Sequence, residues 1–134
     1  MKDLDWSNLS FGYRQTDYNV RCYYRDGKWG EIEVCSDEYL KLHMAATCLH
    51  YGQEAFEGLK AYRCPDGKVR VFRMDENAKR LQSTCRGILM PEVPTEMFEE
   101  MVKKVVRLNQ EWIPTYESGA TLYIRPLLIG TSCL

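Results

Sequence analysis

The stretch that decides the fold runs from residue 54 to residue 74 and reads EAFEGLKAYRCPDGKVRVFRM. Its two arms carry β-branched and aromatic residues, which favour strands. Between the arms lies CPDG, where Pro65 presets φ and Gly67 can take the left-handed conformation that a tight turn requires. The pattern therefore predicts a β-hairpin.

If residues 54–63 form a strand, alternate side chains lie on opposite faces of it. Both faces are mixed, which is typical of a strand covered on both sides with its charges at the rim. A second interpretation makes Lys60 a Schiff-base lysine, since a desolvated lysine amine can attack a carbonyl group. Nothing in the residue pattern singles out that chemistry. The predicted faces are Glu54, Phe56, Gly58, Lys60 and Tyr62 on one side, and Ala55, Glu57, Leu59 and Ala61 on the other.

Two further segments with strand character flank this hairpin along the chain. Residues 17–34 are interrupted by Asp26 and Gly27, which tolerate positive φ and predict another hairpin. Residues 120–130, ATLYIRPLLIG, predict a strand near the end of the chain. Within it, Pro126 implies a bulge or an edge, because proline cannot donate to a ladder.

Two amphipathic segments lie between the hairpins and the last strand. Asp75 is the candidate cap of a helix of about three turns that ends at Gly87. Thr95 is the candidate cap of a second helix, which Pro114 stops. The apolar face predicted for the first helix is Ala78, Leu81 and Cys85, and that of the second is Phe98, Met101, Val102, Val105, Leu108 and Trp112, with Asn109 as its polar exception.

These elements predict one α+β domain in two layers, in which a mostly antiparallel sheet carries its helices on one face. The length of 134 residues is that of a single domain. Lys and Arg number 18 against 19 Asp and Glu, without a run of like charge, so we expect neither a nucleic-acid nor a membrane partner. The start of the chain lacks the apolar core of a signal peptide, and we expect a cytoplasmic protein.

The six cysteines are spread along the chain without a C-x-x-C pair. Because no secretory signal is visible, free thiols are favoured over three disulfides. Neither His43 nor His50 makes a zinc-ligand spacing with a cysteine, so we expect no metal site. The cysteines are Cys22, Cys35, Cys48, Cys64, Cys85 and Cys133.

Two arginines are candidates for binding an anion. Tyr123 and Arg125 share one face of the last strand, roughly 6–7 Å apart, where a phenol and a planar guanidinium could hold a carboxylate. Arg80 lies beside the apolar stripe of its helix, where it could reach a phosphate. For both arginines the alternative interpretation is a side chain that is only exposed to solvent and binds no anion.

Three motifs, taken in their order and spacing, carry a resemblance to a known family. They are LHYGQEAFEGLKAYR at 49–63, DENAKRLQS at 75–83 and LYIRPLLIGTS at 122–132. Together they resemble the amino-terminal half of branched-chain-amino-acid aminotransferases, which are fold type IV (class IV) pyridoxal-phosphate enzymes. The resemblance runs from about Phe11 to Ser132. It implies that residues 1–134 are the small amino-terminal domain of a two-domain enzyme, with cofactor and substrate bound between the domains.

The resemblance also implies roles for individual residues. Arg80 resembles the arginine that holds the phosphate of pyridoxal phosphate. Phe11 and Phe56 are similar to apolar walls of the pocket for a branched side chain. Tyr123 resembles the tyrosine near the substrate α-carboxylate, and Arg125 the residue that recognises the distal carboxylate of glutamate or 2-oxoglutarate.

Two more positions follow from the same resemblance. Tyr51 is similar to a tyrosine that reaches the pocket of the partner subunit, which implies a homodimer. Lys60 matches a lysine that is not the Schiff-base residue of the family, because that lysine lies in the large second domain, which is absent from this chain. We therefore expect no catalytic residue here and no activity of this chain alone. Whether the truncation is natural stays open.

The resemblance implies that the parent protein is a transaminase that moves the amino group of leucine, isoleucine or valine to 2-oxoglutarate, with pyridoxal phosphate as electron sink. Its expected partners are these small molecules, the second domain and a second subunit. A D-amino-acid aminotransferase or an aminodeoxychorismate lyase is an alternative within the superfamily, although YIRP together with FEGLKAYR fits the branched-chain group better. A stand-alone domain with a binding or structural role is the alternative from another class.

Overall fold

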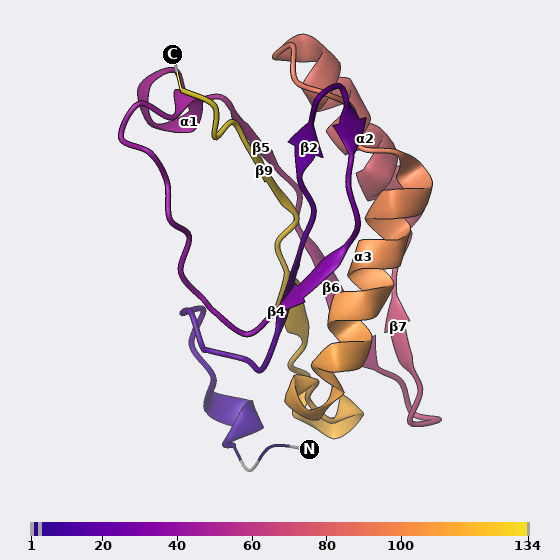
Figure 1. Cartoon of the computed structure of the whole chain (residues 1–134). Coiled ribbons are helices and arrows are strands. Elements are labelled where there is room, and N and C mark those ends of the chain that lie inside the picture. The colour runs from indigo at the N-terminus through magenta and orange to yellow at the C-terminus, as the bar shows by residue number, and fades with distance from the viewer. Residues whose placement is uncertain (1, 3, 134) are drawn as a thin grey trace.

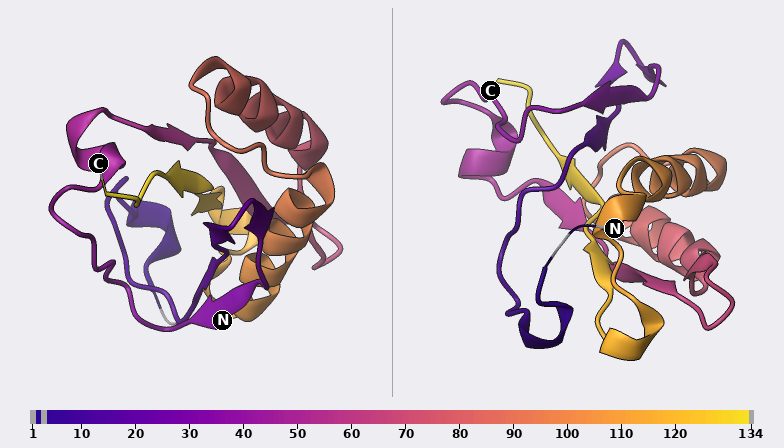
Figure 2. Two further views of the ribbon diagram at one scale, coloured as in Figure 1. Left: turned by 45° about the horizontal axis from the view of Figure 1, so that its top comes forward. Right: turned by 90° about the horizontal axis from the view of Figure 1, so that it is seen from below.

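The fold is α+β, as predicted (Figure 1). The computed structural model describes residues 2 and 4–133, apart from the side chain of Ser7. The two long helices, α2 (Met74–Gly87) and α3 (Thr95–Leu108), lie side by side on one side of the strands (Figure 2). The strands are β1 (Asn19–Arg21), β2 (Tyr24–Arg25), β3 (Lys28–Trp29), β4 (Glu33–Cys35), β5 (Glu54–Phe56), β6 (Leu59–Arg63), β7 (Val69–Val71), β8 (Leu122–Ile124) and β9 (Leu127–Ile129), and the shorter helical turns are η1 (Trp6–Asn8), α1 (Thr47–His50), η2 (Gln110–Trp112) and η3 (Tyr116–Ser118).

The hairpin predicted over residues 17–34 is confirmed. β2 pairs with β3 in antiparallel register, and Asp26 (φ 54°) and Gly27 (φ 80°) form the turn between them. Positive φ at both turn residues gives a two-residue loop whose twist matches that of the strands. Beyond this tip β1 pairs with β4, so the two arms stay together along their length.

The hairpin predicted over residues 54–74 is also confirmed, but its first arm is not one strand. β6 pairs with β7 around a turn in which Gly67 has φ 81°. The arm breaks at Glu57 and Gly58, so that β5 pairs with β9 while β6 pairs with β8. The opposing segment breaks at the same level, at Arg125 and Pro126, where the Glu57 N–H donates to the Pro126 carbonyl (3.0 Å). Pro126 has no N–H to return, which explains the interruption that the sequence predicts there.

The alternation predicted along residues 54–63 is confirmed across this break. Ala55, Glu57, Leu59 and Ala61 are buried, whereas the side chains between them are exposed or half-buried. The buried face packs against α2 and α3, which do not cover the opposite face of the strands (Figure 2). The core members are Ala55, Leu59, Ala61, Ala78, Leu81, Cys85, Met90, Val93, Phe98, Val102, Val106, Ile113 and Ile124.

The predicted helix caps are wrong, although the helices themselves are confirmed. Asp75 and Thr95 both lie inside the first turn, and the residues that precede the helices are Arg73 and Pro94, neither with a side-chain capping bond. Arg73 enters α2 in the left-handed conformation (φ 50°), which no helix-start pattern signals. The predicted end of α2 at Gly87 is confirmed.

Asn109, the polar exception on the apolar face of α3, is buried with its amide fully hydrogen-bonded. It directly follows α3, which ends at Leu108. The prediction that Pro114 stops this helix is therefore wrong, and Trp112 lies in η2 instead of on α3. The side-chain oxygen accepts bonds from the backbone N–H groups of Asp17 and Tyr18 (3.1 Å each). The side-chain nitrogen donates to the carbonyls of Tyr18 (3.0 Å) and Val105 (2.8 Å). One amide thus ties the segment before β1 to the end of α3.

The last residues of the chain lie beside α1, near the label C in Figure 1. The Thr47 N–H donates to the Ser132 carbonyl (3.0 Å), and Ala46 forms an isolated bridge with Cys133. All six cysteines are free thiols. Across the part of the chain that the structure describes, no helix has the length and apolar character needed to cross a membrane.

Candidate functional site

Four of the predicted site residues meet on the face of the strands that α2 and α3 do not cover. The Tyr123 hydroxyl accepts a hydrogen bond from Nη2 of Arg125 (2.8 Å), and the guanidinium carbon of Arg125 lies 4.4 Å from the ring centre of Phe56. Phe11 meets Tyr123 edge to face, with 5.5 Å between the ring centroids. We call these four residues the aromatic–arginine cluster. It joins one cation to three aromatic rings, an arrangement that suits a ligand with both a carboxylate and an apolar part.

Gly58 makes room for this cluster. A Cβ atom at this position would collide with the Tyr123 hydroxyl. The φ of Gly58 is not positive, so the role of glycine here is to let the Tyr123 ring approach the backbone closely, and a larger residue would have to shift that ring. The glycine at the break between β5 and β6 thus leaves space for the Tyr123 side chain.

A second set of polar side chains lies on the other side of the same break. Glu57, which is 4 % exposed, accepts two hydrogen bonds from Nε of Arg80 (2.8 and 3.1 Å) and one from Nη2 (2.6 Å). Asn77 donates to Oε1 of Glu57 (2.9 Å) and to the Gly58 carbonyl (3.3 Å). We call Glu57, Asn77 and Arg80 the carboxylate clamp. Because Asn77 also binds Gly58, the clamp and the aromatic–arginine cluster share one short piece of backbone.

The pKa values of the clamp follow from these contacts. Burial acts to raise the pKa of the Glu57 carboxyl, but hydrogen bonds from Arg80 and Asn77 and the charge of Arg80 together hold the pKa below its usual value. The hydrogen bonds and charge of Glu57 raise the pKa of Arg80 in turn. Both groups are therefore charged at neutral pH, and the buried carboxylate is paired as a buried charge must be.

The lowered pKa of Glu57 gives a pH dependence with a definite sign. The ionised carboxylate stabilises the folded chain fully above its ordinary pKa of 4.5, and this contribution is lost as the pH falls through the lower folded value. We expect the free energy of unfolding, measured by urea denaturation between about pH 3 and 7, to fall more steeply at acid pH in the wild type than in Glu57→Gln. Asp66→Asn is the matched control, because Asp66 pairs with Arg70 on the surface, where solvent screens the pair. Parallel acid profiles for the wild type and Glu57→Gln would contradict this prediction.

The clamp leaves part of Arg80 free to bind an anion. Its side chain is 68 % exposed, and it lines a shallow hollow together with Phe72, Arg73, Glu76 and Asn77. A guanidinium has five N–H donors, of which Glu57 engages the Nε donor and one on Nη2. The Nη1 donors face no partner in the described part of the chain. Arg80 can therefore hold Glu57 on one edge and a phosphate oxygen on the other.

The remaining predicted residues lie apart from these two sets. Tyr51 follows α1 and is 70 % exposed, and within the described residues no hydrogen bond or ring contact joins it to the aromatic–arginine cluster. Lys60 is exposed and lies opposite Tyr123 in the β6–β8 register. Neither residue takes part in a contact that would identify its role within this chain.

Glu57 and Asn77 are the residues of the clamp that sequence reasoning missed. The signal for Glu57 was present, because the alternation places this acid on the same face as Ala55, Leu59 and Ala61, and a buried carboxylate needs a partner. Its partner Arg80 lies 23 positions away on α2. No spacing rule in the sequence could have joined the two.

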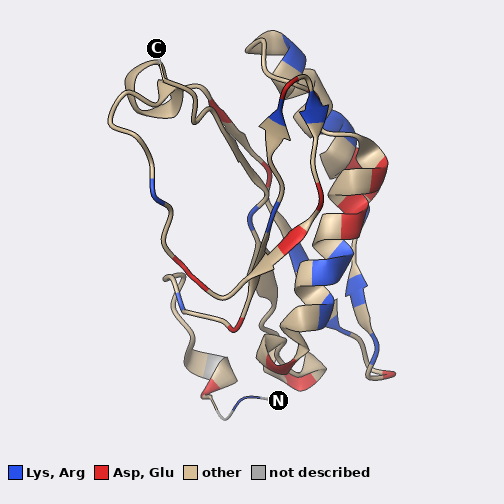
Figure 3. Cartoon of the chain, viewed as in Figure 1, with Lys and Arg blue, Asp and Glu red and all other residues tan. Residues whose placement is uncertain are grey.

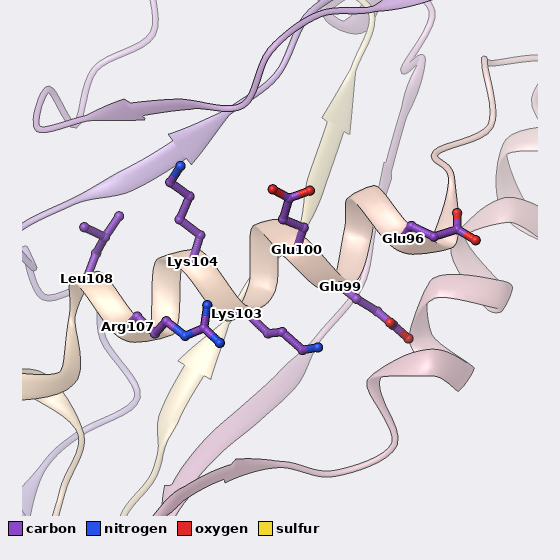
Figure 4. Close-up of a pocket in the computed structure, with 7 residues that line it drawn as sticks. All are labelled: Glu96, Glu99, Glu100, Lys103, Lys104, Arg107 and Leu108. Atoms are coloured by element: carbon purple, nitrogen blue, oxygen red, sulfur yellow. The ribbon is translucent and has the colours of Figure 1, made fainter.

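A hollow on the exposed face of α3 is the other candidate site (Figure 4). Its lining is the charged, solvent-facing surface of one helix, which does not form a binding site. Its acidic residues come first and its basic residues second, which complements the helix dipole and separates the two colours along α3 in Figure 3. Their charged ends project outward and do not converge on a common point in Figure 4. The lining residues are Glu96, Glu99, Glu100, Lys103, Lys104, Arg107 and Leu108.

Known proteins resemble the chain along nearly all of its length. A branched-chain-amino-acid aminotransferase of Haemophilus influenzae is 55 % identical over 130 residues, which is 97 % of this chain and 38 % of that protein. The crystal structure of the branched-chain amino acid aminotransferase of Escherichia coli matches with a TM-score of 0.64 and 27 % identity, over 86 % of this chain and 33 % of that one. The T.th. enzyme of the same name, complexed with N-(5'-phosphopyridoxyl)-L-glutamate, matches with a TM-score of 0.60 and 30 % identity, over 76 % and 32 %. No family model matches the chain.

These comparisons confirm the resemblance to branched-chain-amino-acid aminotransferases and the α+β fold that it implied. The chain spans little more than a third of the length of the relatives it matches.

Proposed function

We propose that this chain is the amino-terminal domain of a branched-chain-amino-acid aminotransferase. The observation that carries the proposal is the 55 % identity along 97 % of the chain to an enzyme of that name. The proposed reaction moves the amino group of leucine, isoleucine or valine to 2-oxoglutarate. The larger second domain supplies the lysine that carries the cofactor, and this chain supplies binding residues.

The proposed cofactor is pyridoxal 5'-phosphate, and Arg80 is the residue proposed to hold its phosphate. The fit rests on the free guanidinium edge of Arg80 and on the hollow that it lines with Arg73 and Asn77. A related protein, the T.th. enzyme, binds a phosphopyridoxyl group linked to glutamate. When bound, the cofactor supplies an electron sink at the substrate α-carbon.

The aromatic–arginine cluster is the proposed substrate-reading surface. Phe11 and Phe56 offer apolar contact to a branched side chain, and Tyr123 offers a hydroxyl donor to the α-carboxylate. Arg125 stacks on Phe56, which leaves its charge at the edge of an apolar surface. The same pocket can then take leucine by contact with the rings, or glutamate by pairing its distal carboxylate with Arg125. These residues orient the substrate, and they make or break no bond themselves.

The exposed aromatic residues are suited to an interface with the second domain or with a partner subunit. Phe11, Tyr51 and Phe56 are respectively 88, 70 and 57 % exposed, although aromatic rings are usually covered. We place the second domain over the aromatic–arginine cluster and assign Tyr51 to the pocket of the partner subunit of a homodimer. We further propose that the enzyme acts in the cytoplasm.

Borohydride reduction of the full-length protein loaded with pyridoxal phosphate tests this assignment. We expect one cofactor fixed to a lysine outside residues 1–134, because Lys60 is exposed and lies apart from the Arg80 hollow. Peptide mapping by mass spectrometry locates the adduct, and Lys60→Arg is the control that should retain it. An adduct on Lys60, or a full-length protein that takes up no cofactor, would contradict the proposal.

A further inference from the structure

We infer that Glu57 is a positioning residue that sets the orientation in which Arg80 meets the phosphate of the cofactor. The inference rests on the proposed function for the identity of the anion. It adds a role for Glu57 that the comparisons do not assign. Glu57 acts only through Arg80 and does not itself touch the cofactor.

The geometry of the clamp carries the inference. The Glu57 carboxylate binds Arg80 side-on, through Nε and Nη2 at 2.8 and 2.6 Å. Such a paired contact fixes the plane of the guanidinium as well as its position. The opposite edge, which includes both Nη1 donors, has no partner among the described residues, and Arg80 itself lines the hollow together with Phe72 and Arg73. An exposed arginine without this contact would sample many rotamers and lose that freedom on binding.

The carboxylate itself is held in place, which a positioning role requires. Glu57 lies at the break between β5 and β6, and its backbone N–H is bound to the Pro126 carbonyl. Asn77 donates to Oε1, so the carboxylate has a second partner besides Arg80. A buried acid, fixed by backbone and by an amide, is a rigid support for a mobile side chain.

If only charge mattered, Glu57 would weaken the binding of the phosphate, whereas the positioning role means that Glu57 strengthens it. The carboxylate neutralises Arg80, and its removal would leave the hollow one unit more positive and more attractive to a dianion. Solvent screens the extra attraction, because the Arg80 guanidinium is exposed. The cost of losing the fixed orientation of Arg80 is not reduced by screening. We therefore expect orientation to outweigh charge. The two accounts predict changes of opposite sign.

The test compares pyridoxal phosphate with pyridoxal, which lacks the phosphate, as ligands of the full-length apoprotein. The factor by which the phosphate tightens binding, Kd of pyridoxal divided by Kd of pyridoxal phosphate, is measured by absorbance titration and cancels any loss of folded protein. Glu57→Gln should reduce this ratio about tenfold, the order expected when a charge-assisted contact loses its geometry. Glu76→Gln is the matched control, because it adds the same charge to the hollow and Glu76 pairs with Arg73 and Lys79 rather than with Arg80. Its ratio should stay at the wild-type value or rise.

A second variant keeps the inference open to test if Glu57→Gln does not fold. Arg80→Lys retains the charge but cannot bind Glu57 through two nitrogens on one rigid plane, and it should lower the ratio to a similar extent. A ratio that is unchanged or increased in Glu57→Gln, or unchanged in Arg80→Lys, would overturn the positioning role. A wild-type protein that binds both ligands equally would instead overturn the proposed phosphate site itself, and the inference with it.

Discussion

Arg125→Met in the full-length protein should lower kcat/KM for glutamate and 2-oxoglutarate about ten- to a hundred-fold. The guanidinium is proposed to pair with the distal carboxylate, a charge-assisted contact worth roughly 1.5–3 kcal/mol at about 1.4 kcal/mol per tenfold change. Leucine has no distal charge, so its half-reaction should fall much less. Methionine is the replacement of choice because its thioether can keep the contact with the Phe56 ring that Arg125 makes in the structure. The two half-reactions are followed separately by the absorbance change of the cofactor.

Lys60→Met is the matched control for Arg125→Met. Lys60 is an exposed cation on the same face and lies opposite Tyr123 in the strand register. Its loss should change the rates for leucine and glutamate little and to a similar extent. Equal losses for both substrates in Arg125→Met would show that Arg125 only supports Tyr123 and Phe56, and would remove the specificity role.

Asn109→Ala should lower the free energy of unfolding of the chain by about 2–4 kcal/mol. The change removes four hydrogen bonds, each worth roughly 0.5–1.5 kcal/mol net, but some of the freed backbone groups of Asp17 and Tyr18 can recover bonds to water. Urea denaturation measures the change. The m-value should stay similar if the whole domain still unfolds together.

Asn8→Ala is the control for this experiment. Asn8 is exposed, and its side chain makes one bond, to Asp5. Surface substitutions of this kind stay within about 0.5 kcal/mol. If Asn109→Ala destabilised the chain no more than Asn8→Ala, the amide would not be what holds the segment before β1 to α3.

The sequence predicted the features that depend on neighbouring residues. Alternation along residues 54–63 assigned Glu57 and Lys60 to the correct faces, and helical spacing assigned the buried face of α2. The turns were predicted because Asp26, Gly27 and Gly67 carry their conformational preference in their own chemistry. These features need no knowledge of what lies across the fold.

Features that depend on distant partners were missed. An interruption was predicted at Pro126 but not at Glu57, which lies opposite it and donates to its carbonyl. Asn109 was assigned to the apolar face of its helix, but its backbone partners, 91 and 92 positions earlier, were not predicted. The clamp joins Glu57 to Arg80 between a strand end and a helix. Residue chemistry made Arg80 and Arg125 candidates for binding an anion, but their specific roles came from the resemblance, since a solvated arginine and a ligand-binding one look alike in a single sequence.

For enzyme engineering, the adjacency of Glu57 and Gly58 means that the two ends of the proposed site cannot be redesigned independently. A side chain at position 58 would displace the Tyr123 ring from its present place, since a Cβ atom there collides with the Tyr123 hydroxyl. If the backbone moved instead, it would change the position of the Glu57 carboxyl that binds Arg80, because Glu57 and Gly58 share a peptide bond. Libraries that seek new substrates should therefore keep this dipeptide and vary Phe11, whose ring is almost wholly exposed and reaches Tyr123 from a separate segment of the chain.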